Sequence, residues 1–165
     1  MSITLNSQAQ IVADLLQQRR ARLVLAESCT SGLVAVTLAT VPGISEWLCG
    51  SAVTYREATK QQWLNVSASD LKQFTSTSDS VARQMAIGVL NHTPEANLAG
   101  SVTGHLGPGA PDGFDGVIFV GVANRQEDGT IHCNVERHQL QQQERQDRKQ
   151  EAANIVLSSL ASFLA

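Results

Sequence analysis

Apolar residues recur along this chain at two spacings, one typical of helices and the other typical of strands. In residues 7–20 they share one face at positions i, i+1, i+4 and i+5, which predicts an amphipathic helix. Residues 117–123 are continuously apolar, as expected of a central strand buried on both faces. Residues 130–138 alternate between apolar and polar, as expected of a half-exposed strand. A hairpin at 127–129 is expected to join these two strands.

The same reasoning places elements along the whole chain, with glycine, proline and capping residues marking their ends. The predicted helices cover residues 7–20, 32–41, 57–64, 67–74 (a turn with a short helix), 78–90 and 141–164. The predicted strands cover residues 22–26, 50–55, 97–103, 117–123 and 130–138. Helices that flank a mixed sheet predict an α/β protein built as a three-layer α/β/α sandwich. Since no repeat or linker interrupts the pattern, we expect a single domain over residues 1–165.

The first half of the last predicted helix, "QQQERQDRKQEA", is polar on all sides. We expect it to project beyond the core or to pack on a partner. Arg145, Arg148 and Lys149 are spaced to grip a phosphate, but the interleaved carboxylates favour a solvated face linked by salt bridges.

Composition narrows the classes of function. The chain has 165 residues, 42% of them hydrophobic and 16% charged, as is typical of globular proteins. The net charge of −3 and the lack of a Lys/Arg cluster argue against binding to nucleic acid or to a membrane surface. Three cysteines and four histidines match no metal-ligand spacing, so no metal is expected. With neither a signal peptide nor a membrane-spanning apolar run, we expect a cytoplasmic protein.

The turn in "LAESCTSGLVA" (25–35) carries the strongest chemical signal. A strand-to-helix turn points several backbone N–H groups, and the positive end of a helix dipole, at whatever lies above it. Ser28 is therefore well placed for acyl transfer, with those N–H groups holding the oxyanion. The alternative is that Ser28 or Thr30 only caps the helix. Cys29 is interpreted as a packing residue, because the sequence places no histidine beside it.

A serine nucleophile needs a base, and Lys60 is the lysine best placed to serve as one. It lies in "TYREATK", beyond strand 50–55, whose exit lies beside that of strand 22–26 if the two strands are neighbours. Tyr55 stands at the same exit. Burial, with Arg56 as a neighbouring cation, would have to lower the pKa of Lys60 to about 7–8 for general-base work. The alternative is an ordinary solvated lysine.

A second turn, "SVTGHLGPG" (101–109), follows strand 97–103. Open α/β sheets bind ligands outside the carboxyl ends of their strands, so we expect this loop to line the same cleft. It matches neither the dinucleotide-binding nor the P-loop pattern. His105, a bulky titratable residue among glycines, is either a ligand contact or an exposed bystander.

The strings "AESCTSG", "GSAVTYREATK" and "SVTGHLGPG", in this order, resemble the C-terminal domain of the CinA (competence-damage inducible) proteins. Stand-alone members of that family are nicotinamide-nucleotide amidases. The resemblance runs from about Ile11 to Leu164. It implies an α/β/α sandwich and a homodimer or higher homo-oligomer. It also implies hydrolysis of the carboxamide of nicotinamide mononucleotide, without metal or cofactor, to nicotinate mononucleotide and ammonia.

The resemblance also assigns roles to single residues. It implies that Ser28 is the nucleophile, Lys60 the general base and Tyr55 a residue that supports this pair. The residues expected to contact the substrate are Thr30, Ser31, Gly32, Thr103, Gly104, His105, Gly107, Pro108 and Arg145.

Several positions around the expected pocket depart from the family pattern. Ser31 stands where the family usually has a second glycine, and Arg56–Glu57 replaces a Ser-Asn pair. His105–Leu106 replaces a smaller pair, "GFDG" (113–116) replaces Lys-Pro-Val-Gly, and Gln143–Glu144–Arg145 replaces Gly-Asp-Arg. The expected catalytic residues are kept while pocket residues differ. Three hypotheses follow: a nicotinamide mononucleotide amidase, an amidase for a different small amide, and an inactive module that binds a nucleotide or a partner protein.

Overall fold

The computed structural model describes residues 4–165, so the first three residues of the predicted domain lie outside the described residues. Five strands form one mixed sheet in the order β2-β1-β3-β4-β5. The strands are β1 (Leu23–Glu27), β2 (Leu48–Val53), β3 (Leu98–Gly104), β4 (Val117–Arg125) and β5 (Ile131–Gln139). β1 pairs in parallel with β2 and β3, whereas β4 and β5 are added antiparallel. The condition under which Lys60 was expected to reach Ser28, that the first two strands are neighbours, is therefore met.

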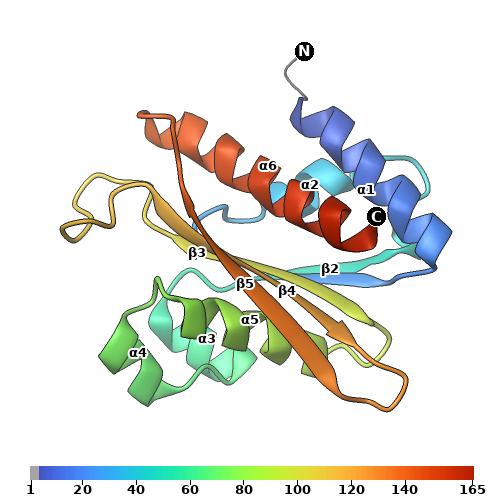
Figure 1. Cartoon of the computed structure of the whole chain (residues 1–165), viewed down its shortest axis with the longest axis horizontal. Helices are drawn as coiled ribbons and strands as arrows, with labels where there is room; N and C mark the ends of the chain where they lie inside the picture. The colour runs from blue at the N-terminus through green and yellow to red at the C-terminus, as the bar shows by residue number, and fades with distance from the viewer. Residues whose placement is uncertain (1–3) are drawn as a thin grey trace.

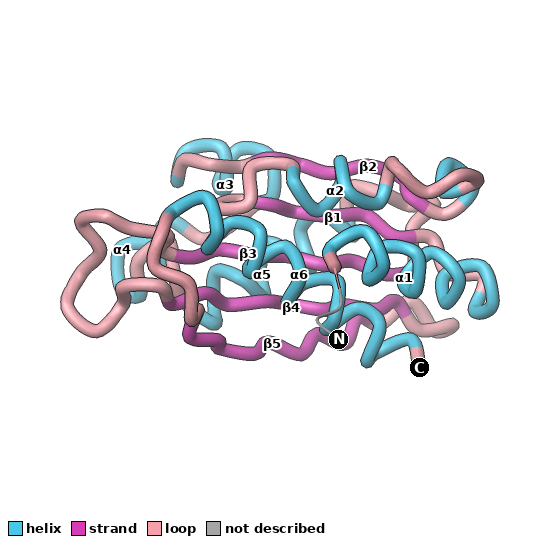
Figure 2. The backbone as a smooth tube through the Cα atoms, turned by 90° about the horizontal axis from the view of Figure 1, so that it is seen from above, coloured by secondary structure: helices cyan, strands magenta, loops and turns pink. Residues whose placement is uncertain are grey.

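Helices cover both faces of the sheet, which confirms the predicted α/β/α architecture (Figure 1). The helices are α1 (Leu5–Arg19), α2 (Leu33–Leu38), α3 (Glu57–Leu64), α4 (Ala68–Phe74), α5 (Asp79–Asn91) and α6 (Arg145–Leu164), with a 3-10 turn at Ile44–Glu46. α1, α2 and α6 lie over one face, and α3, α4 and α5 lie over the other. Figure 2 shows the first of these layers in front of the strands.

Alternation along β1 shows how the sequence builds the two halves of the core. Leu23 and Leu25 point toward α1, α2 and α6, while Val24 and Ala26 join the cluster formed with α5. All four side chains are buried, because β1 is covered by helices on both faces. The next residue, Glu27, is therefore delivered to the α2 side, and Ser28 to the opposite side.

The last helix begins later than its pattern predicts. It starts at Arg145 rather than at 141, because the backbone N–H groups of Gln141 and Gln142 donate to the Glu151 carboxylate instead of entering the helix. The expectation of a solvated face is also wrong for Arg148. Its side chain is buried, and it forms an ion pair with Asp115 in the loop between β3 and β4.

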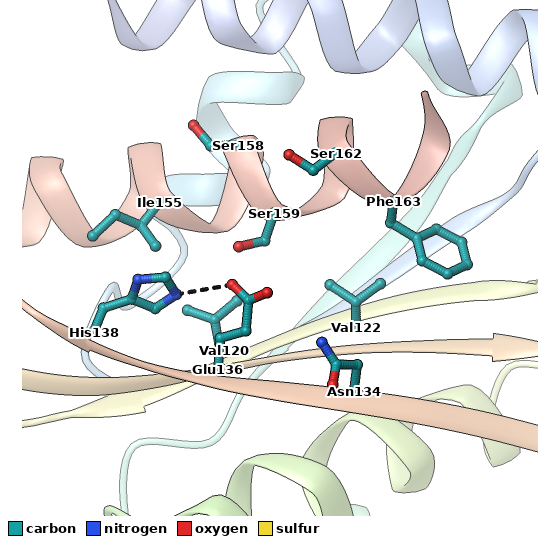
Figure 3. A pocket seen from close by; sticks show the side chains of 10 residues that line it. All are labelled: Val120, Val122, Asn134, Glu136, His138, Ile155, Ser158, Ser159, Ser162 and Phe163. Atoms are coloured by element: carbon teal, nitrogen blue, oxygen red, sulfur yellow. Dashed lines mark ion pairs between the residues drawn. The ribbon is translucent and has the colours of Figure 1, made fainter.

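The face of β5 that looks toward α6 is polar, as the predicted alternation requires. Asn134, Glu136 and His138 project from it into a cavity of about 450 Å³ beneath α6 (Figure 3). His138 Nε2 lies 3.3 Å from a Glu136 oxygen. This cavity shares no residue with the predicted site, which lies at the carboxyl ends of β1 and β3. Within residues 4–165 no helix is both long and apolar enough to cross a membrane.

Candidate active site

The turn after β1 is organised around the buried carboxylate of Glu27. One oxygen, Oε2, accepts hydrogen bonds from the Thr30 hydroxyl at 2.6 Å and from the N–H groups of Gly32 and Val34 at 3.0 and 3.1 Å. The other, Oε1, accepts from the Ala35 N–H and the Ser51 hydroxyl, both at 3.0 Å. The N–H groups of Gly32, Val34 and Ala35 are free donors at the N-terminus of α2, whose N-cap residue, Gly32, carries no capping side chain. Glu27 therefore fixes the shape of the turn that presents Ser28.

Ser28 and Lys60 meet below the cleft. Lys60 lies on α3, which follows β2, and its Nζ donates to Ser28 Oγ at 2.8 Å and to the Thr54 carbonyl at 2.7 Å. The side chains of Ser28 and Lys60 are 7% and 1% exposed. Both residues come from the carboxyl ends of neighbouring parallel strands, as their sequence positions predicted.

The burial of Lys60 makes its neutral form more accessible than that of an exposed lysine. Burial lowers the pKa of Lys60 from its ordinary value of 10.5 to about 8, while Cys29 and Glu57 act in the opposite direction. Arg56 is not among the causes of this shift. A neutral amine 2.8 Å from a hydroxyl is able to accept the hydroxyl proton.

Cys29, although next to Ser28, is electrostatically unsuited to attack. Its side chain is 5% exposed, and burial raises the pKa of its thiol from 9.0 to about 12. The thiol therefore stays protonated at neutral pH, and the thiolate is the nucleophilic form.

A cleft of about 220 Å³ opens above Ser28 at the carboxyl ends of the strands. The predicted residues that line it are Ser28, Tyr55, Thr103, Gly104, His105, Gly107, Pro108 and Arg145. Cys29, Ser76, Thr77, Leu106, Gly109 and Ala110 complete its wall. Within the described residues no group of three or more His, Cys, Asp or Glu side chains is placed to hold a metal ion.

Three residues predicted to contact the substrate do not line the cleft. The Thr30 hydroxyl is turned inward to Glu27, and Thr30 is 1% exposed. Ser31 is exposed and has a left-handed backbone with φ of 47°, which suits the glycine usual in the family. Gly32 has φ of 96° at the start of α2. These residues shape the turn rather than the pocket.

Arg145 joins the far wall of the cleft to the exit of β2. Its Nη2 donates to the Tyr55 hydroxyl at 2.7 Å, and its Nη1 donates to the Gly107 carbonyl. Tyr55, expected to support Ser28 and Lys60, is thus hydrogen-bonded to Arg145, more than eighty residues later in the chain. The lining of the cleft therefore includes a guanidinium as well as Ser28.

Sequence reasoning missed two contributions to this site. Glu27 was left without a role, although a carboxylate between an apolar strand and a helix start is a capping signal. Ser76 and Thr77, in the linker between α4 and α5, line the cleft because the Thr103 hydroxyl holds the Ser76 carbonyl at 2.7 Å. No local pattern marks that linker as part of a site.

Comparison with known proteins identifies the family and several relatives of this chain. The protein-family model of the CinA C-terminal domain matches residues 5–164. A CinA-like protein of Synechococcus elongatus is 38% identical over 120 residues, or 72% of this chain and 28% of that protein. A protein of Enterobacter agglomerans named nicotinamide-nucleotide amidohydrolase PncC is 40% identical over 108 residues, or 64% of each chain. The crystal structure of a competence or damage-inducible protein from Enterobacter asburiae superposes with a TM-score of 0.90 at 23% identity, covering 99% of this chain and all of that one. This chain thus spans about 28–35% of the length of the CinA-like relatives.

Proposed function

Because the chain belongs to the CinA C-terminal domain family, we propose that it is a serine amidohydrolase that converts nicotinamide mononucleotide to nicotinate mononucleotide and ammonia. The proposal is supported by the similarity to a protein named nicotinamide-nucleotide amidohydrolase. The observation that carries it is the buried contact of 2.8 Å between Lys60 Nζ and Ser28 Oγ, with the pKa of Lys60 lowered to about 8.

In the proposed first half-reaction, neutral Lys60 removes the Ser28 proton while Oγ attacks the carboxamide carbon. The carbonyl oxygen becomes an oxyanion, for which the backbone N–H groups of Cys29 and Thr30 are the candidate donors. Within residues 4–165 neither of these N–H groups donates to a backbone oxygen, but both lie close enough to Cys29 Sγ to act on the pKa of that thiol, so they would have to turn from the sulfur to the oxyanion. Protonated Lys60 then gives its proton to the departing amine, and ammonia leaves an acyl-serine.

In the second half-reaction, water replaces ammonia. Neutral Lys60 takes a proton from the water, and the resulting hydroxide attacks the acyl carbon. Ser28 regains its proton from Lys60 as the acyl bond breaks, and the carboxylic acid product then loses its own proton to the solvent. Arg145, at the cleft wall, is placed to attract the phosphate of the nucleotide, since a guanidinium matches a phosphate in charge and geometry.

The test is an ammonia assay with nicotinamide mononucleotide on the wild-type chain and on Ser28→Ala and Lys60→Met. Each variant is expected to lose at least about 10³-fold in kcat, the scale on which removing a nucleophile or its base acts. Ser31→Gly is the matched control in the same turn, because Ser31 is exposed and does not line the cleft. Turnover by Ser28→Ala at the wild-type rate would refute the mechanism.

A different small amide is the second candidate substrate, favoured by His105. Its imidazole occupies the cleft wall where the family has a smaller residue, and its Nε2 is buried without a partner within the described residues. Its ring meets the edge of Phe114 at a centroid distance of 6.2 Å. A panel of pyridine and aliphatic amides decides between the two: the second candidate requires at least one of them to exceed nicotinamide mononucleotide in kcat/KM.

A further inference from the structure

We infer that Arg148 is a positioning residue: it fastens residues 105–116, the loop that walls the cleft, to α6, and it thereby holds Arg145 in place for substrate binding. The part of the inference that concerns substrate binding rests on the proposed function. Its structural part, the fastening of the loop, is independent of which reaction the cleft performs.

The contacts of Arg148 reach both ends of this loop. Its Nη1 and Nη2 each donate to one oxygen of Asp115 at 2.8 Å, which is the bidentate geometry that makes arginine–carboxylate pairs specific. Nη1 also donates to the Leu106 carbonyl at 3.3 Å, and Nε donates to the Gln142 carbonyl at 2.8 Å. Asp115 stands at the end of the loop and Leu106 near its start, so one guanidinium closes the loop onto α6.

Two glycines make the room that this guanidinium needs. A Cβ on Gly107 would lie 3.0 Å from both Arg148 Nη1 and Asp115 Oδ1. A Cβ on Gly116 would lie 3.3 Å from Arg148 Cζ. Both glycines also have positive φ, 72° and 70°, which other residues rarely adopt. The loop is therefore shaped to receive this one side chain.

The fastened loop forms part of the cleft wall and also holds Arg145. Leu106, Gly107 and Pro108 line the cleft, and the Gly107 carbonyl accepts from Arg145, which lies one helical turn before Arg148 on α6. Arg148 is itself absent from that wall and is 5% exposed. Because Arg148 does not line the cleft, its effect on a substrate bound there has to pass through the loop and Arg145.

Arg148→Lys tests the inference, because lysine keeps the charge but cannot form the bidentate pair or reach both carbonyls. Asp115→Asn is the second variant, which removes the carboxylate and leaves the arginine. Arg19→Lys is the matched control: Arg19, on α1, donates to the Leu164 carbonyl at the other end of α6. Two quantities are measured: amide hydrogen exchange, and kcat and KM for nicotinamide mononucleotide.

We expect both test variants to raise the exchange rates of the Phe114, Gly116 and Leu140 amides, all hydrogen-bonded in or to the loop, by on the order of tenfold. Exchange in α5 should stay at the wild-type rate. KM should rise on the order of tenfold with kcat within about threefold, since binding is perturbed and Ser28 and Lys60 are not. Arg19→Lys should change neither quantity.

Unchanged loop exchange in both variants would overturn the inference, as would an equal rise throughout the chain, which marks a general loss of stability. A fall in kcat at constant KM would overturn the part of the inference that concerns substrate binding. If the wild-type chain releases no ammonia from nicotinamide mononucleotide, the proposed function fails, and the exchange measurement alone decides whether Arg148 fastens the loop.

Discussion

Lys60 should make the stability of this protein depend on pH in a way that a single substitution abolishes. Burial lowers its pKa from 10.5 to about 8, so between these values the unfolded chain holds a proton that the folded chain has released. Stability therefore rises as pH rises through this window. The full difference in the pKa of Lys60 between the two states corresponds to about 3 kcal/mol of folding stability. About 2 kcal/mol of it is gained by the folded chain between about pH 7 and about pH 9.5.

The measurement is urea unfolding of the wild-type chain and of Lys60→Met at several pH values in that range. Methionine fills a similar space without a charge, so groups that titrate in both proteins, Cys29 among them, cancel in the difference between the two curves. The wild-type chain should gain about 2 kcal/mol relative to the variant on going from about pH 7 to about pH 9.5. The same ionisation should appear as a rise of kcat/KM with pH, with its midpoint near the pKa of about 8.

Parallel stability curves for the two proteins would refute the reasoning, because they would mean that Lys60 keeps its ordinary pKa in the folded chain. A wild-type chain that loses stability relative to Lys60→Met as pH rises would refute it too, because that sign requires the folded state to hold the proton more tightly than the unfolded state. A normal pKa would also remove the proposed base, so the stability experiment bears directly on the mechanism.

Three further predictions concern the turn after β1. Glu27→Gln should lower the free energy of unfolding by at least about 3 kcal/mol in urea titrations. In the wild-type chain both carboxylate oxygens accept from buried donors, and in the variant an NH₂ group would replace one of these acceptors. Cys29→Ala should keep most of the ammonia release, and iodoacetamide should not inactivate the wild-type chain, because the pKa of the thiol is about 12. Ser31→Gly should change stability by less than about 1 kcal/mol, since relief of the left-handed backbone is offset by greater freedom of the unfolded chain. A large loss of activity in Cys29→Ala, or of stability in Ser31→Gly, would contradict these assignments.

Local pattern was sufficient for the strands and for most of the helices, and it brought Ser28 near Lys60 on the condition, met in the structure, that the first two strands are neighbours. The family resemblance read from the motifs is confirmed by the match over residues 5–164. β1 and β2 read as strands on their apolar content alone, and parallel neighbours bring their exits together. The Ser78 cap of α5 was also readable, and its hydroxyl accepts from the Val81 N–H at 3.2 Å.

Long-range partners were beyond the reach of such patterns. Arg148 has the same local context as any arginine among carboxylates, and only the packed loop supplies Asp115, thirty-three residues earlier, as its partner. For a similar reason α6 begins later than predicted, because the Gln141 and Gln142 N–H groups donate to the Glu151 carboxylate and do not enter the helix. Glu27 was visible as a carboxylate, but its five donors come from the turn, α2 and β2 together.

The two walls of the cleft are maintained by separate hydrogen-bond networks. One is centred on Glu27 and presents Ser28, and the other joins Arg145, Arg148 and the loop at 105–116. The hydrogen bond between Arg145 and Tyr55 joins the second network to the exit of β2, the strand beside β1. Substitutions in the second network can therefore change which molecule the cleft would bind while the contact between Ser28 and Lys60 stays the same. Of the positions at which the sequence was expected to depart from the family pattern, 105–106, 113–116 and 143–144 fall in or beside the second network, whereas Ser31 lies in the turn of the first.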